Sequence, residues 1–478
     1  MNVDFHYHAT HLAARYAGFS KEEANIIAYA AQFVDDCTKS NAPADSPKRY
    51  TCMSIGEMEK MNLKPVDWKY EDYRKLTEIW QYFHFLPGNE FYTNRYSGKR
   101  SNKRWTFSEE DEEIFRKMCK PQSVAIWNMI EDTKRYRGTS NFLHMIGMRM
   151  HVLADTWAHQ NFIGFPLWFA NEVDSDSVEV EVNGKWKKVT YYSWRLSMKD
   201  SLEFLSFSNT PTMDSYESIS YLGHGRLGTV ADIPCLRFRY QPAWMEAKTL
   251  LTRSNVDVFT DAFHQMVYAM RCIKDNTSFD PEYISSEYKA KVAAVLNVWK
   301  IDQSNEWDQL IKKEFGYIPD AYDAKKWKKE YEEEKKLGNY ILFINSANDH
   351  VSLMNSITNT ARFQHCRISD KSIRHSSLIN YLNWDKKSCS MVCVNGQMYM
   401  REIFNSYPTG KLKMVDMIEY LEHNFHDKWK CKIDMYKKEF HHQYSGTGVP
   451  DRYGTICNYC AWGDEKWEAK LIEGKYIK

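Results

Sequence analysis

The sequence predicts a mainly α-helical protein. We expect a multi-helix, bundle-like domain over residues 1–358 with a β-hairpin insertion at about 176–190, and a smaller α+β unit over residues 359–478. Three observations predict this class. Apolar residues recur at helical spacing between Ala24 and Val34, a long apolar stretch covers residues 140–163, and the texture becomes β-like at Ser388–Met400. This change from helical to β-like residue patterns places a domain boundary near residue 358.

A helix is predicted to begin at Ser20, because Ser20 and Glu23 have the spacing of a capping box. Its apolar stripe extends to about Asp36. Periodicity predicts further helices over residues 71–84, 121–137, 140–163, 255–274, 283–300, 325–336 and 338–356. Val178–Val189 alternates around Asn183-Gly184, a pair typical of a two-residue type I′ turn. Because helices flank this hairpin, we expect it to be a surface excursion.

Composition excludes several classes of protein. The chain has 478 residues, of which 43% are hydrophobic and 15% aromatic, so it can bury a sizeable core. Its 64 basic and 63 acidic residues give a net charge of +1, so no global field attracts nucleic acid or an acidic membrane. We find no signal-like leader and no apolar run long enough for a transmembrane helix. The 11 scattered cysteines do not resemble a disulfide framework, which favours a cytoplasmic location.

The central motif lies in the apolar stretch 140–163. It consists of His144, His151, Asp155 and His159. Spacings of seven, four and four residues keep the four side chains within roughly 80° on a helix. Because burying three histidines and a carboxylate is costly without compensation, a divalent metal is the favoured interpretation. The alternative is a set of buried histidines that hydrogen-bond to backbone, and His144 could lie outside the ligand shell.

Other segments offer further ligands. His6 and His8 would share a side of an extended N-terminus, whereas His8 and His11 would share a face of a helix. Of the acidic pair that ends the helix after Ser20, Asp35 continues the apolar stripe and is expected to face the core, although Asp36 is also a candidate. The remaining candidates are His224 and Asp232 in a glycine-rich loop, Arg226 in the same loop, and His84 among aromatic residues.

Six motifs in order resemble a bacterial family of unknown function, the DUF6765 family. They are Asp4–His6, Ala17–Phe19, Asp35-Asp36, Phe83–Gly88, Ala154–Gln160 and Gly223–Pro234. The resemblance covers roughly residues 1–358 and implies no established activity. The family usually has proline where this chain has Ala231. A weaker resemblance, carried by the His-x3-Asp-x3-His helix, is to zinc-dependent phospholipase C and the P1-type nucleases, although their N-terminal tryptophan is absent here.

Together these observations favour a metal-dependent hydrolase, with a phosphodiester as its substrate. The cofactor would be two or more divalent ions, with zinc expected and manganese or iron as alternatives. Asp155, His84 and Arg226 are the expected catalytic or substrate-contacting residues. The substrate would be a phosphate-containing small molecule, a lipid head group or a nucleic acid. A helical di-iron oxygenase and a non-enzymatic module stapled by metal remain alternatives.

Two other features of the sequence suggest sites. The basic loop at residues 95–104 could help to hold an anionic substrate, although a solvated loop is the commoner meaning of such a run. Cys457 and Cys460, together with Cys389 and Cys393, could form a second zinc site in the C-terminal unit. Simple unpaired thiols are the alternative for these four cysteines.

Overall fold

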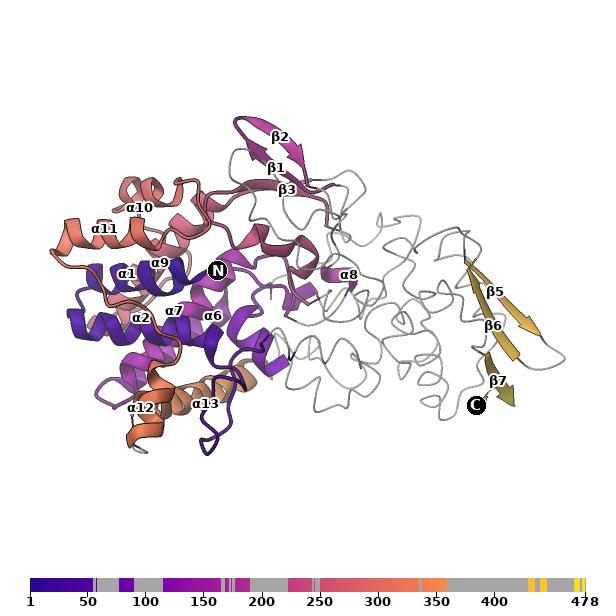
Figure 1. Cartoon of the computed structure of the whole chain (residues 1–478), viewed down its shortest axis with the longest axis horizontal. Coiled ribbons are helices and arrows are strands. Elements are labelled where there is room, and N and C mark those ends of the chain that lie inside the picture. Colours follow the sequence, from indigo (N-terminus) through magenta and orange to yellow (C-terminus); the bar gives the residue numbers. More distant parts are fainter. Residues whose placement is uncertain are drawn as a thin grey trace.

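The structure is a computed structural model. It describes residues 1–54, 77–89, 115–164, 177–189, 222–242, 250–334 and 338–358, a few isolated positions between these ranges, and four strands after residue 428. Helices dominate the N-terminal part, as the sequence predicted (Figure 1). The α-helices are α1 (Thr10–Tyr16), α2 (Lys21–Asp36), α6 (Val124–Thr133), α7 (Phe142–Ala158), α8 (Trp168–Asn171), α9 (Asn255–Asp275), α10 (Lys289–Leu296), α11 (Ser304–Phe315), α12 (Lys326–Glu334) and α13 (Asn339–Thr358).

Short helices of other types lie between them. The π-helices are η1 (Asp4–Ala9) and η3 (Thr77–His84), and the 3₁₀ segments are η4 (Phe115–Lys117), η5 (Lys134–Tyr136) and η8 (Gly225–Ala231). π-helices are rare in proteins, and those that do occur are often found at functional sites. Both π-helices here carry histidines that the sequence analysis singled out, namely His6 and His84.

Helix α7 is the centre of the helical body. Every residue from His144 to Ala158 is buried, and α7 packs against α2, α9, α13, α6 and η3. At Gly147 the two backbones come close, because an added Cβ would lie 2.1 Å from the carbonyl oxygen of Ile27 on α2. The absence of a side chain at this position therefore lets α2 and α7 lie side by side.

The capping box that begins α2 is confirmed. The Ser20 backbone N–H donates to the Glu23 carboxylate at 2.7 Å, and the Glu23 N–H donates to the Ser20 hydroxyl at 3.1 Å. Helix α7 is shorter than expected: it ends at Ala158, so His159 is its C-cap residue. Helix α11 was not predicted. It contributes the fully buried Trp307 to the main core.

The predicted hairpin is confirmed, but the expectation that it is a surface excursion is wrong. Strands β1 (Glu179–Val182) and β2 (Lys185–Lys188) pair around Asn183 and Gly184, whose φ angles of 51° and 72° fit a type I′ turn. Strand β1 also pairs with β3 (Arg237–Tyr240), which pairs with β4 (Leu251–Ser254). The resulting antiparallel sheet, in the order β2-β1-β3-β4, buries a second apolar cluster that includes Phe85, Phe162 and Leu227.

Beyond residue 428 the described strands are β5 (Trp429–Asp434), β6 (Glu439–Tyr444), β7 (Glu468–Ile472) and β8 (Lys475–Ile477). They form a second antiparallel sheet in sequence order. Residues 388–400, Cys457 and Cys460 lie outside the described residues, and so does the basic loop at 95–104. The β-like stretch, the zinc site of four cysteines and the anion-binding loop therefore stay predictions.

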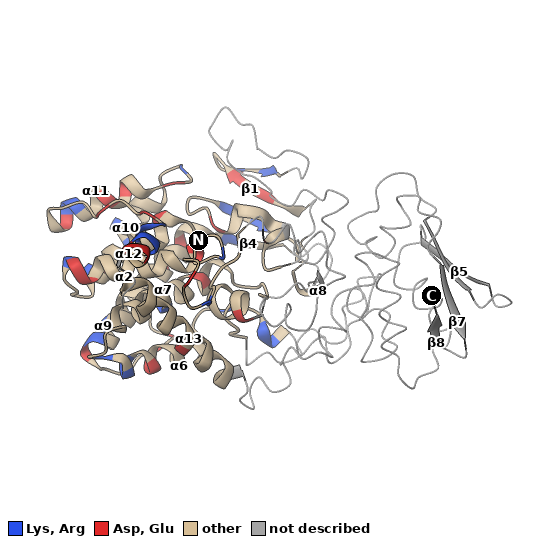
Figure 2. Cartoon of the chain, turned by 60° about the horizontal axis from the view of Figure 1, so that its bottom comes forward, with Lys and Arg blue, Asp and Glu red and all other residues tan. Residues whose placement is uncertain are grey.

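Basic and acidic residues are interspersed over the outer helices in the view of Figure 2, consistent with the net charge of +1. Among the described residues, no helix combines the length and the apolar character needed to cross a membrane.

Candidate metal centre

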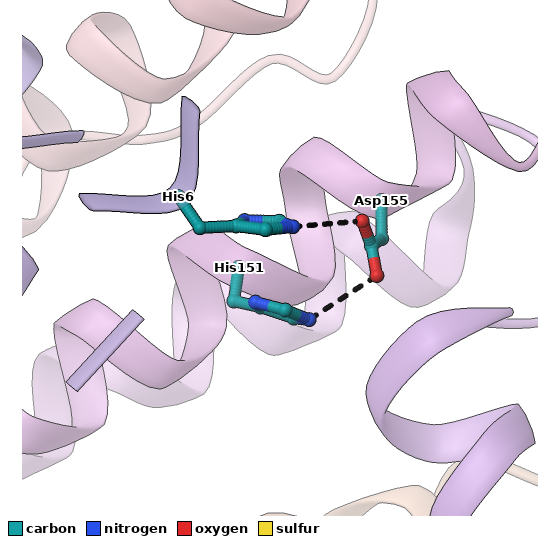
Figure 3. A group of neighbouring side chains, drawn as sticks. All are labelled: His6, His151 and Asp155. Carbon is teal, nitrogen blue, oxygen red and sulfur yellow. Dashed lines mark ion pairs between the residues drawn. The ribbon is translucent and has the colours of Figure 1, made fainter. Parts of the chain in front are cut away.

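Asp155 lies at the centre of a buried group of histidines. Its Oδ2 atom is 3.1 Å from Nε2 of His151, one turn earlier on α7, and 3.2 Å from Nδ1 of His84. Its Oδ1 atom is 3.2 Å from Nε2 of His6. Figure 3 shows the rings of His6 and His151 lying face to face, each directed at a different oxygen of Asp155; their centroids are 3.8 Å apart.

The π-helix η1 determines which N-terminal residues reach Asp155. Because the chain is helical from Asp4 onward, His6 and His8 point in different directions. The amino group of Met1 also reaches the cluster. Its nitrogen lies 3.1 Å from Oδ1 of Asp155 and 3.3 Å from Oδ1 of Asp232, so one cation spans two carboxylates.

Asp35 and His84 form the second side of the cluster. Oδ1 of Asp35, in the last turn of α2, is 3.7 Å from both Nδ1 of His84 and Nε2 of His151. These two nitrogens are 3.3 Å apart. His84 ends the π-helix η3, and its other nitrogen, Nε2, donates to the carbonyl oxygen of Thr51 at 2.9 Å. This bond leaves Nδ1 of His84 as the atom that faces Asp35 and Asp155.

His159, His224 and Asp232 form a third group next to the first two. Nε2 of His159 is 3.1 Å from Oδ1 of Asp232, and Nε2 of His224 is 3.4 Å from Oδ2 of the same carboxylate. His224 and Asp232 flank η8, which is kinked at Gly228, where φ is 67°. This conformation is readily adopted only by glycine, and the kink brings the two ends of η8 together.

Phe85 supports the third group. Its ring stacks on His159 with the centroids 4.6 Å apart and is tilted against His224 at 5.8 Å. A Cβ added at Gly223 would lie 2.0 Å from this ring, so the glycine lets the loop approach Phe85. The stacking restricts the orientation of both imidazoles.

The donor atoms fit a divalent metal. Three groups have donor atoms that all lie within 4.8 Å of one another: His6–His151–Asp155, Asp35–His84–His151 and His159–His224–Asp232. The donor atoms in contact within these groups are 3.1 to 3.7 Å apart, near the distance of about 3.3 Å between ligands on a tetrahedral ion with bonds of ~2.0–2.1 Å. Nδ1 and Nε2 of His6 and Nδ1 of His151 are buried without a hydrogen-bond partner in the described part of the chain. Coordination to a divalent cation would satisfy atoms such as Nε2 of His6.

Electrostatics keep the carboxylates ionised. Burial alone would raise the pKa of Asp155, but His159, the Met1 amino group and His151 outweigh it and hold that pKa well below the usual range. The pKa of Asp232 is also held well below its usual range, because the Met1 amino group and His224 outweigh burial. Burial opposes the positive charge of the Met1 amino group, yet Asp155 and Asp232 raise its pKa to about 11.

The pKa values of the histidines differ. Burial lowers the pKa of His6 to about 3 and that of His224 to about 4, so both are neutral at pH 7, the form that binds metal. Burial also opposes the charged form of His84, but the hydrogen bond that His84 donates to Asp155 outweighs it and raises the His84 pKa well above 6.5. Without a metal, His84 therefore carries the proton that compensates Asp155.

Three residues named as candidate ligands lie outside the three groups. His8 contacts Asp308, with Nδ1 2.6 Å from Oδ1, because the helical N-terminus turns it away from His6. Asp36 accepts from the Tyr322 hydroxyl at 2.7 Å and from Gln32 at 3.2 Å, since it lies about 100° around α2 from Asp35. His144 lies 3.0 Å from Oδ1 of Asn339 on α13. His144 lies seven positions before His151 on α7, and its partner Asn339 belongs to a different helix. It is therefore not part of the three groups.

Arg226 belongs to η8, but its side chain lies outside the described part, so its contact with substrate stays a prediction. Arg253 and Asn255 were not predicted from the sequence. Arg253 donates to the carbonyl oxygens of Ala158 and Ala231, the residues that precede His159 and Asp232. Asn255 donates to the carbonyl oxygens on both sides of Asp232. Neither residue lies in a motif, and only the tertiary structure reveals their positions.

The centre is reached by solvent at two places. The side chain of Asp35 is 30% exposed, and those of His224 and Asp232 are 15% and 16% exposed, whereas His6, His151 and Asp155 are fully or almost fully buried. A separate pocket, lined by residues such as His264, Arg271 and Tyr288, lies on α9 away from this centre. Both nitrogens of His264 are bonded there, to the Thr260 carbonyl and the Tyr288 N–H, so we assign it a structural role.

A mainly helical body that encloses a buried His/Asp cluster suited to divalent metal defines the class of this protein. The chain belongs to a family of unknown function, DUF6765, which matches residues 1–393. The match confirms the resemblance carried by the six motifs and extends past residue 358. No curated protein and no solved structure matches the chain. The similarity to zinc-dependent phospholipase C and the P1-type nucleases therefore stays a hypothesis.

Proposed function

We propose that this protein is a metal-dependent hydrolase that cleaves phosphodiesters with zinc as its cofactor. One observation carries the proposal. Three His/Asp groups lie side by side: His151 belongs to two of them, and Asp155 is 3.6 Å from His159 of the third. Such an arrangement can hold more than one ion, and paired ions are typical of enzymes that act on phosphate esters.

The donor set favours zinc over magnesium and calcium. Five imidazoles and three carboxylates make up the three groups. Imidazole suits zinc, whereas sites for magnesium and calcium consist of carboxylate, carbonyl and water oxygens. When bound, divalent ions lower the pKa of water and neutralise charge that develops on phosphate oxygens.

The residues of the centre would have different roles. Asp155 would stay ionised and hold ions through both oxygens, because its pKa is depressed. His84 would present Nδ1, since its Nε2 is fixed by the Thr51 carbonyl. Arg226, two residues after His224, would contact a phosphate. The exposed edges at Asp35 and Asp232 would admit the substrate.

The exposed edges also argue against a purely structural metal. A purely structural metal is typically bound by protein ligands at all of its coordination positions, whereas a catalytic metal keeps one coordination position open. A helical di-iron oxygenase is a second alternative, which the metal content of the protein distinguishes. The likeness of the α7 motif to phospholipase C and P1-type nucleases supports the phosphodiester as substrate only as an analogy.

The test uses the full chain purified without chelator. We expect elemental analysis to find zinc at more than one ion per chain, and bis-p-nitrophenyl phosphate to be hydrolysed in a chelator-sensitive way. Phosphatidylcholine vesicles and single-stranded DNA then distinguish a lipid head group from a nucleic acid as substrate. Iron as the dominant metal, or a fully metallated protein without activity on any of these three substrates, would contradict the proposal.

A further inference from the structure

The histidines of the centre differ in how their outward nitrogens are held. Nδ1 of His159 donates to the carbonyl oxygen of His84 at 2.7 Å, and Nδ1 of His224 donates to that of Gly228 at 2.9 Å. Each bond holds the ring and leaves Nε2 as the atom directed at Asp232. Both imidazoles of the third group are therefore oriented before any ion binds.

The segments that carry this group are also fixed. Asn255 donates through Nδ2 to the carbonyl oxygens of Val230 at 2.8 Å and Ile233 at 2.7 Å, on either side of Asp232. Arg253 donates to Ala231 at 3.1 Å and to Ala158, so one guanidinium joins the loop of Asp232 to the end of α7. The pair holds the backbone on both sides of the Asp232–His159 contact.

The other two groups have less of this support, because only His84 among their histidines is bonded at its outward nitrogen, to the Thr51 carbonyl. Nδ1 of His6 and Nδ1 of His151 have no hydrogen-bond partner within the described ranges. The two groups also share one atom, because Nε2 of His151 is 3.1 Å from Asp155 and 3.7 Å from Asp35. One nitrogen binds one ion, so His6–Asp155 and Asp35–His84 are alternative partners of His151.

We propose that the centre binds two ions in a fixed order: the first, tight ion at His159–His224–Asp232, and the second, exchangeable ion beside His151. Arg253 and Asn255 are positioning residues for the first ion. This inference rests on the metal centre of the proposed function but does not depend on the reaction. Hydrogen bonds to the outer nitrogen of metal-binding histidines contribute about 10–100-fold to metal affinity, which gives the expected difference between the two sites.

The test titrates chelator-treated full-length protein with Zn²⁺ by calorimetry and with Co²⁺ by visible absorption. We expect two binding steps that differ at least ~10-fold in affinity. His224→Gln should remove the first step, and His6→Gln should leave the first step and weaken the second. Elemental analysis after dialysis counts the ions that each variant retains.

A conservative variant tests the positioning residues. Arg253→Lys should weaken the first step about 10–100-fold and leave the second unchanged. Arg149→Lys is the matched control, because Arg149 is also a buried arginine that donates to a carbonyl oxygen, that of Met129, but it belongs to the contact between α7 and α6. This control should lower stability without changing either step.

The outcomes separate this inference from the proposed function. A first step that survives His224→Gln, or that disappears in His6→Gln, would overturn the order while leaving the metal centre intact. A single ion per chain, or three, would overturn the count. Absence of any bound metal in the natural protein would overturn both proposals. If His224→Gln does not fold, Arg253→Lys and Asn255→Ala decide the order by the same measurement.

Discussion

Oδ2 of Asp155 lies 3.2 Å from Nδ1 of His84, although 71 residues separate the two in the chain. One residue belongs to the central helix α7, and the other ends the π-helix η3. Asp155 thereby contacts histidines from three elements, and the negative charge of its carboxylate balances positive charge inside the core.

Replacing Asp155 should remove most of the bound metal. Asp155→Asn keeps the shape of the side chain but deletes the charge that the surrounding imidazoles and ions share. We expect turnover of bis-p-nitrophenyl phosphate to fall at least ~100-fold, the upper range for loss of a group that supports a metal. Metal content, measured alongside activity, should fall as well; full occupancy in this variant would refute the assignment.

The acidic pair at the end of α2 offers a matched comparison. Asp35 faces His84 and His151, whereas Asp36 is bonded to Tyr322 and Gln32. Asp35→Asn should lower metal content and activity, and Asp36→Asn should leave both nearly unchanged. The reverse pattern in elemental analysis would show that the second residue of the pair serves the centre.

His144 belongs to the predicted helix motif but lies outside the three His/Asp groups. Its contact with Asn339 on α13 predicts that His144→Gln retains its metal, while His151→Gln loses the exchangeable ion. Gln can preserve a hydrogen bond to the Asn339 amide, so the effect on stability should stay below ~1.5 kcal/mol. Metal loss in His144→Gln equal to that in His151→Gln would place His144 in the ligand set after all.

The metal-free protein should lose stability in acid. Burial lowers the pKa of His6, His11 and His350 from 6.5 to about 3, so the unfolded chain takes up these protons first as the pH falls. The contribution is fully present above about pH 6.5 and is lost as the pH falls toward 3, by up to ~1.4 kcal/mol per pH unit for each group. His84 has the opposite sign, because its raised pKa stabilises the fold at low pH.

Urea unfolding of chelator-treated protein between pH 7 and pH 4 measures this dependence. His350 bonds to the carbonyl oxygen of Tyr82 outside the metal centre, so His350→Gln should make the pH dependence shallower without changing metal content. A free energy of unfolding that stays constant over this range would contradict the prediction.

The contact between α2 and α7 should not tolerate a side chain. Gly147→Ala would place a methyl group 2.1 Å from the carbonyl oxygen of Ile27, so the helices must separate. Overpacking of this kind typically costs ~1–3 kcal/mol. Gly138→Ala is the control, because nothing lies within 4 Å of its added Cβ and only its positive φ of 81° is strained. Thermal melts should rank Gly147→Ala as the more destabilised variant.

The sequence by itself determined the helical class, the capping box of α2, the type I′ hairpin and the spacing of His151 and Asp155 on α7. Each of these depends on residues close together in the chain, where periodicity, turn geometry and the helical repeat act directly. The His151–Asp155 relation is one turn of one helix, and for that reason it could be predicted.

Only the tertiary structure decided which other residues meet Asp155. Whether the N-terminus is helical or extended chooses between His6 and His8, and the kink at Gly228 determines that His224 reaches Asp232. Arg253 and Asn255 act through backbone carbonyls of distant segments, which carry no sequence signal because every residue has a carbonyl oxygen. Long-range contacts of this kind follow from how helices and sheet pack, and local sequence patterns do not encode that packing.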